Sequence, residues 1–129
     1  MQRLYGTMIN CAPDPIAARR VVDQAEAVIA ETDSCMLCDV MFAVPAAIAC
    51  ADVGDLDRAR SYLATADASA ARWAGTAWQA AALEARAHLA RAEGQEAEYV
   101  SLLARAGGLF ERAGHARDAA RMVAATAGG

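Results

Sequence analysis

The chain has 129 residues, enough for one domain with a hydrophobic core, and it carries a formal net charge of −4. Hydrophobic residues make up 57% of it, and alanine, the best helix former, supplies more than a quarter. The acidic balance argues against unassisted binding to nucleic acid or to an anionic membrane surface. We find no uncharged apolar run of membrane-spanning length and no signal-peptide layout, so we expect a cytoplasmic, all-α protein.

Helical periodicity runs along nearly the whole chain, because small and apolar residues recur at spacings of three and four. We predict helices over 2–11, 15–31, 36–52, 55–72, 76–93, 95–112 and 115–126. Asp14 is expected to cap the second helix, since Pro15 tolerates the first helical position. Pro45 lies inside the third helix, where we expect a bend.

Turn signals recur between these helices at nearly constant spacing. Pro13-Asp14, Gly54-Asp55 and Gly94-Gln95 are separated by intervals of 41 and 40 residues, and Gly114 begins a further half-repeat. A period of this size is typical of helical-repeat proteins. The sequence therefore predicts one domain over 1–129, an α-α superhelix of about three helical hairpins of about 40 residues and a half-repeat.

The two helices of a repeat are expected to differ in their apolar faces. The segment 76–93 has apolar residues on two opposite sides, which is typical of a helix sandwiched between neighbours. The segment 95–112 has one broad apolar face, which is typical of an outer helix. In the half-repeat, Ala119 and Val123 are expected on the inward register.

Several stretches resemble a known family. Cys35-Met-Leu-Cys38, the run from Pro45 to Ala59, and Leu109-Phe-Glu-Arg-Ala-Gly114 are similar to tetratricopeptide-like repeats. More narrowly, they resemble the C-terminal repeat region of large actinobacterial transcription regulators of the LuxR/MalT type, and the use of arginine for every basic residue fits a GC-rich genome. The resemblance implies a TPR-like, non-enzymatic arm that binds a protein, peptide or inducer, or that self-associates. The ATPase and helix-turn-helix parts of such regulators have no counterpart in these residues, so DNA binding is not implied.

The candidate binding residues lie at the junction before the segment 76–93 and along one flank of it. Trp73 and Trp78 flank Gly75 at a helix junction, and they either pack this junction or form an aromatic lip for a ligand. Gln79 and Arg86 lie seven residues apart on one polar flank, which in such arrays usually faces the concave groove. A solvated stripe is the simpler interpretation, but a peptide or acidic ligand would be expected here. Arg3 is a candidate for the same surface.

Cys35 and Cys38 form a C-x-x-C pair at an expected helix start, where the helix dipole lowers the pKa of a thiol. The pair suits a reversible disulfide, or half of a metal site completed by an outside ligand such as Asp33 or Asp39. Small thiols without such a role are the simplest alternative. A four-cysteine metal site is unlikely, because Cys50 would lie about 18 Å along the same helix from Cys38.

The remaining candidates have plain interpretations. Cys11 and Cys50 are expected as small packing residues that could approach each other across adjacent repeats. His88 and His115 are isolated in sequence, and we expect them to be solvated or satisfied by neighbours.

Three functions follow from these observations. The first is a protein-interaction or ligand-binding module of a transcription regulator, with a protein or peptide partner or a second copy of itself, and with no cofactor. The second is a thiol-based redox or metal sensor that uses Cys35 and Cys38. The third is an accessory protein or small enzyme of secondary metabolism, which is disfavoured because no paired acid–base or nucleophile motif is visible.

Overall fold

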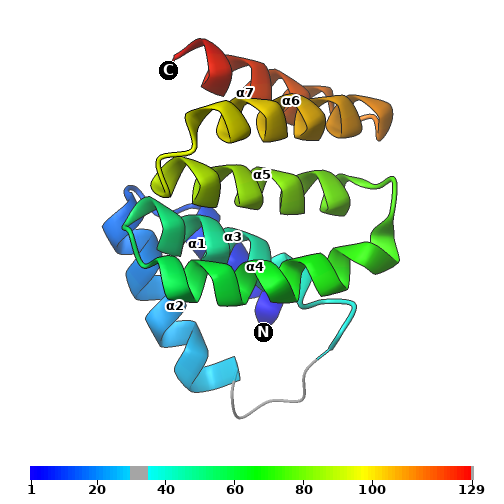
Figure 1. Cartoon of the computed structure of the whole chain (residues 1–129). Helices are drawn as coiled ribbons and strands as arrows, with labels where there is room; N and C mark the ends of the chain where they lie inside the picture. The colour runs from blue at the N-terminus through cyan, green and yellow to red at the C-terminus, as the bar shows by residue number, and fades with distance from the viewer. Residues whose placement is uncertain (30–34, 129) are drawn as a thin grey trace.

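The computed structural model describes residues 1–29 and 35–128, and within these ranges it is entirely helical (Figure 1). The α-helices are α1 (Gln2–Asn10), α2 (Pro15–Ile29), α3 (Val40–Asp52), α4 (Leu56–Ala70), α5 (Ala77–Ala92), α6 (Glu96–Arg112) and α7 (Ala116–Ala127). A short 3₁₀ helix, η1 (Ala71–Trp73), follows α4. The all-α prediction is confirmed, and none of the described helices is long and apolar enough to cross a membrane.

The helix boundaries agree with the sequence prediction to within a few residues, except at α3. This helix begins at Val40 rather than at residue 36, because residues 36–39 form turns. It then runs without interruption through Pro45 to Asp52. At the start of α2, the expected cap is present, since the backbone N–H of Ala17 donates to Asp14 Oδ1 at 2.7 Å.

The helices stack in order from the N-terminal pair to α7 at the far end (Figure 1). Helix α3 packs between α1 and α5, α2 packs on α1 and α3, and α4 packs on α3 and α5. Helix α6 covers α5, and α7 in turn packs on α6. Odd-numbered helices therefore form one row through α1, α3 and α5, and the even-numbered helices lie outside that row.

Three of the turns share one backbone geometry. Gly54, Gly94 and Gly114 have φ angles of 80°, 78° and 81°, a region that glycine enters at little cost. In each turn the next N–H donates to a carbonyl five residues earlier, as in Asp55 to Cys50 at 2.9 Å and Gln95 to Ala90 at 2.8 Å. This is the Schellman helix end. The 40-residue interval between the first two glycines therefore marks structurally equivalent turns.

The buried residues form two clusters that meet at α5. One cluster extends over α1 to α5 and takes Ala82, Ala85 and Leu89 from α5. The other extends over α5 to α7 and takes Ala80, Ala87 and Ala90 from the opposite side. The prediction that this helix is sandwiched between neighbours is confirmed.

The last two helices follow the predicted pattern of buried residues in α6 but not in α7. Helix α6 buries one face, formed by Tyr99, Leu102, Leu103, Ala106 and Phe110. In α7 the inward register was wrong for Val123, which is 68% exposed, while its neighbour Met122 is buried. Alanine occupies so many positions in α7 that the sequence of this helix does not show which of two adjacent faces is buried.

Candidate functional site

A cavity of about 1140 Å³ opens along the row of odd-numbered helices. Its lining comes from α1, α3, η1 and α5, with further residues from the end of α6 and the start of α7. Residues far apart in the sequence, such as Arg3 and Arg121, therefore line one hollow. We call this cavity the groove.

Part of the groove lining is apolar, and it includes both tryptophans of the chain. Val44, Pro45 and Ile48 come from α3, while Trp73 and Trp78 come from the junction before α5 and from its first turn. Thr76 fixes this junction, because its hydroxyl oxygen caps α5 by accepting from the N–H of Trp78 at 3.3 Å. The Nε1 donor of Trp73 is buried and has no hydrogen-bond partner among the described residues.

The polar part of the lining includes Glu84 of α5. This carboxylate is 9% exposed, and Arg121 of α7 holds both of its oxygens, at 2.8 Å from Nη1 and 3.1 Å from Nη2. Arg121 also donates from Nη2 to Asp118 at 3.0 Å. These charge-assisted hydrogen bonds, Glu84 foremost, raise the pKa of the Arg121 guanidinium. A bidentate pair therefore connects α5 to α7 across the groove wall.

His88 lies one turn further along α5 and is also satisfied. Its Nδ1 lies 2.7 Å from Oδ1 of Asp52, at the end of α3. Arg91 reaches the same carboxylate oxygen at 3.5 Å and stacks over the ring of Tyr99, with 5.0 Å from its Cζ to the ring centroid. The expectation for His88 is met, and the same contacts place an imidazole on the groove wall.

The sequence-predicted binding residues divide into two groups. Trp73, Trp78 and Arg3 line the groove. Gln79 and Arg86 lie outside it, because Gln79 Oε1 accepts from the N–H of Gly75 at 2.7 Å and Arg86 pairs with Asp67 of α4.

The groove lies along the polar flank of α5 opposite to the one that carries Gln79 and Arg86. The groove-lining residues of this helix are Trp78, Ala81, Glu84 and His88, whose spacings of three and four define one face. Gln79 and Arg86 belong to the flank turned toward α4. Both flanks are polar in sequence, so the spacing alone does not show which flank faces the groove.

Cys35 and Cys38 lie in the turn before α3 and not inside a helix. Both are free thiols, with 2.7 Å between their Sγ atoms, and the N–H of Cys38 donates to the carbonyl of Cys35 at 2.8 Å. Of the expected outside metal ligands, Asp33 falls outside the described residues. The described part of the chain contains no group of three cysteine, histidine or carboxylate side chains that could hold a metal ion.

The other two cysteines differ from this pair. Cys11 is exposed at the end of α1, whereas Cys50 is completely buried in α3. Burial raises the pKa of the Cys50 thiol to about 12. Cys50 is thus a packing residue, as expected.

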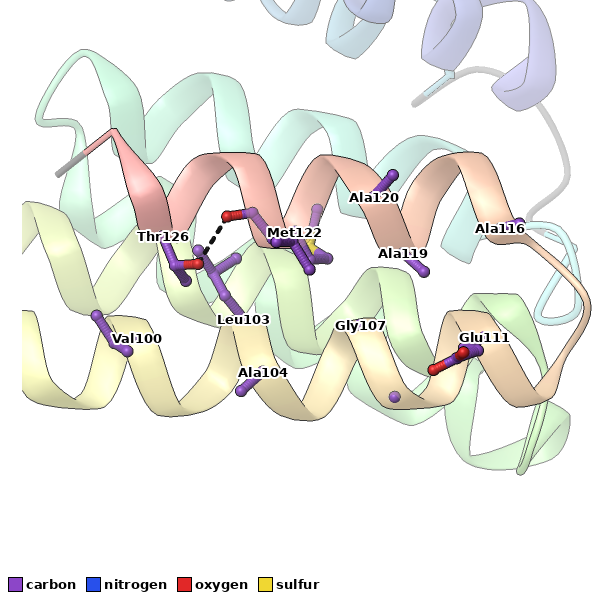
Figure 2. A pocket seen from close by; sticks show the side chains of 12 residues that line it. Val100, Leu103, Ala104, Gly107, Glu111, Ala116, Ala119, Ala120, Met122 and Thr126 are labelled. Atoms are coloured by element: carbon purple, nitrogen blue, oxygen red, sulfur yellow. Dashed lines mark hydrogen bonds between the residues drawn. The ribbon is translucent and has the colours of Figure 1, made fainter.

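A second hollow of about 650 Å³ lies between α6 and α7 (Figure 2). Small side chains dominate its lining, among them Ala104, Ala116 and Ala120. Among the described residues that line it, Glu111 is the one that can ionise, and the hydroxyl of Thr126 donates to the carbonyl of Val123 at 2.7 Å. This hollow offers few groups that could fix a ligand's orientation, so the groove is the stronger candidate site.

Comparison with protein-family models, with curated proteins and with solved structures found no match. The relationship to tetratricopeptide-like repeats and to LuxR/MalT-type regulators therefore stays a prediction from the residues quoted above.

Proposed function

We propose that this chain is a TPR-like helical-repeat module that binds a peptide in the groove. The observation that carries the proposal is the groove itself, whose lining combines apolar residues such as Trp73 and Trp78 with charged residues such as Glu84. In this proposal the module is the cytoplasmic interaction arm of an actinobacterial LuxR/MalT-type transcription regulator, and it is not an enzyme.

The chemistry of the groove favours a peptide over a strongly charged ligand. The acidic and basic side chains of its wall largely neutralise one another, since Arg121 pairs with Glu84 and Asp118. A ligand that enters therefore meets little net charge, and its apolar side chains gain most by covering the tryptophans. Trp73 Nε1 is buried without a partner among the described residues, so a peptide carbonyl that displaced the side chains covering it would satisfy its N–H.

The ionisable side chains of the groove are already engaged in contacts within the protein, which fits binding better than catalysis. Glu84 and His88 are engaged by residues of neighbouring helices, Arg121 and Asp52. Groups held in this way stabilise the wall of the groove and orient it. A catalytic base would instead need a contact with the reacting proton of a substrate.

The test uses two threonines that are matched except for their position. Thr7 lies at the groove, and Thr65 lies on α4 away from it. Both are exposed, and each hydroxyl donates to the carbonyl four residues earlier, at 2.9 Å and 3.4 Å. Thr7→Trp would therefore place a large side chain in the groove, while Thr65→Trp would place the same side chain on a remote helix face.

Peptides are first selected from a random library on the intact chain, and their affinities for the three proteins are then measured by calorimetry. We expect Thr65→Trp to bind like the unaltered chain and Thr7→Trp to bind at least about tenfold more weakly, a difference of about 1.4 kcal/mol. Equal binding by Thr7→Trp, or failure of the library to yield any binder, would contradict the proposal.

A further inference from the structure

The pair Cys35 and Cys38 has a geometry that the peptide-binding proposal does not use. Their Sγ atoms are 2.7 Å apart and thus in direct contact, so only a small movement separates them from the length of a disulfide bond, about 2.05 Å. Backbone hydrogen bonds from Cys38 and Asp39 to the Cys35 carbonyl, at 2.8 Å and 3.0 Å, hold the turn that brings them together. The dithiol is thus already assembled for ring closure.

The two thiols are not equivalent. Cys35 is exposed and Cys38 is only partly exposed, so an external reagent reaches Cys35 first. When Cys35 ionises, its thiolate can accept a hydrogen bond from the Cys38 thiol, which lowers the pKa of Cys35. The same hydrogen bond raises the pKa of Cys38. Exposure and ionisation therefore assign the nucleophile to the same residue.

We propose that Cys35 and Cys38 form a thiol–disulfide exchange site, in which Cys35 attacks a low-molecular-weight disulfide and Cys38 resolves the product. In the first step the Cys35 thiolate forms a bond to one sulfur of the small disulfide, whose other sulfur leaves as a thiolate. In the second step Cys38 loses its proton to solvent and attacks Cys35 Sγ, and the second small thiolate leaves. The chain gains one disulfide and the small disulfide becomes two thiols, so atoms and electrons balance.

The surroundings of the turn favour exchange over a structural crosslink. Ser69 of α4 donates to the carbonyl of Met36 at 2.9 Å and accepts from the N–H of Val40 at 3.3 Å. Gln2 of α1 donates to Asp39 Oδ1 at 2.5 Å. The turn is therefore already tied to two helices by hydrogen bonds. A Cys35–Cys38 disulfide closes only a four-residue loop, which constrains the unfolded chain little.

The test uses oxidised glutathione as the small disulfide and the whole chain as the protein. Each cysteine is identified by alkylation and peptide mass spectrometry after defined times of reaction. In the unaltered chain we expect a Cys35–Cys38 disulfide, with Cys11 and Cys50 still alkylatable after unfolding. In Cys38→Ser the mixed disulfide should accumulate on Cys35, because the resolving thiol is missing.

Cys11 is the internal control, since it is exposed and has no thiol neighbour in the described part of the chain. We expect Cys35 of Cys38→Ser to react at least about tenfold faster than Cys11, while Cys38 of Cys35→Ser reacts more slowly than Cys35. Circular dichroism of both variants checks their folding, and Cys38→Thr, whose hydroxyl can also donate to the Cys35 thiolate, replaces Cys38→Ser if the latter unfolds. Equal rates at Cys35 and Cys11, faster capture at Cys38, or no intramolecular disulfide would overturn the proposal. These readouts do not depend on any ligand of the groove.

Discussion

The backbones of Gly6 and Met41 lie so close that no side chain fits between them. A Cβ atom at Gly6 would lie 2.0 Å from the carbonyl oxygen of Met41. That carbonyl is four residues before Pro45, which has no N–H to donate to it. The proline thus leaves a carbonyl without its usual intrahelical bond, and the glycine lets α1 approach this position on α3. Both residues belong to the lining of the groove.

Replacing Gly6 by alanine is therefore expected to destabilise the protein despite the higher helix propensity of alanine. The added methyl group would force α1 away from α3, at a cost of about 1–3 kcal/mol in the free energy of unfolding. Gly107→Ala is the control, because its nearest neighbour, Met122 Cβ, would lie at an ordinary 3.4 Å. Denaturant titration should show a lower free energy of unfolding for Gly6→Ala only. A higher free energy of unfolding in both Gly6→Ala and Gly107→Ala would contradict the close approach of the two backbones.

The repeated turns make a second prediction. Gly54→Ala and Gly94→Ala should each cost about 1–2 kcal/mol, because each glycine has a positive φ and open space around its Cβ position. Gly108→Ala should instead stabilise by about 0.5–1 kcal/mol, since Gly108 lies inside α6. Thermal unfolding of the three variants checks this order. Unequal costs at Gly54 and Gly94 would count against the equivalence of the two turns.

Because Glu84 is more buried than Arg121, we expect removal of Arg121 to destabilise the protein more than neutralisation of Glu84. Arg121→Met leaves a buried carboxylate without its cation and should cost about 2 kcal/mol. Glu84→Gln keeps one acceptor for Arg121 and should cost less. Arg60→Met is the control, because Arg60 is as exposed as Arg121 but pairs with carboxylates that are more open to solvent than Glu84. The free energy of unfolding should therefore fall by less than about 1 kcal/mol in this variant.

A double-variant cycle measures the pair directly. If Glu84 and Arg121 stabilise the groove wall together, the cost of the double variant should be smaller than the sum of the single costs. Additive costs would show that the two side chains act independently.

The buried thiol of Cys50 leads us to expect that the free energy of unfolding falls at alkaline pH. Its pKa is about 12 in the folded protein, above the ordinary thiol value of about 8.5 in the unfolded chain. The unfolded chain therefore loses the proton first as pH rises, and the folded state loses stability above about pH 8.5. By pH 10 this loss should reach about 2 kcal/mol, and it should continue up to the folded-state pKa.

Cys50→Ala isolates this effect, because it removes the titrating group while leaving Cys11, Cys35 and Cys38 in place. The difference in unfolding free energy between the variant and the unaltered chain should be constant below pH 8. It should shrink between pH 8.5 and 10. A difference that is the same at pH 7 and pH 10 would show that the buried thiol ionises without penalty.

Most of the helical framework could be predicted from the sequence, because its signals are local. The Schellman glycines, the cap at Asp14 and the two apolar stripes of α5 each follow from spacing within one turn or one helix. The close approach at Gly6 could not be predicted in this way, since its partner Met41 is 35 positions further along the chain.

The candidate site was only partly predictable for the same reason. Trp73 and Trp78 were identified by their place at a junction, and they do line the groove. The roles of Glu84 and His88 depend on Arg121 and Asp52, which belong to other helices. The choice between the two polar flanks of α5 is therefore made by tertiary packing, which one helix's periodicity does not encode.

The most direct test of the groove as a binding site uses its two tryptophans, which are the only ones in the chain. Their indole N–H resonances can be followed by ¹H–¹⁵N NMR while a library-selected peptide is added. We predict that both resonances shift with one shared dissociation constant and that the Trp73 signal moves downfield as its Nε1 gains an acceptor. A peptide that binds while both indole signals stay unchanged would contradict the account.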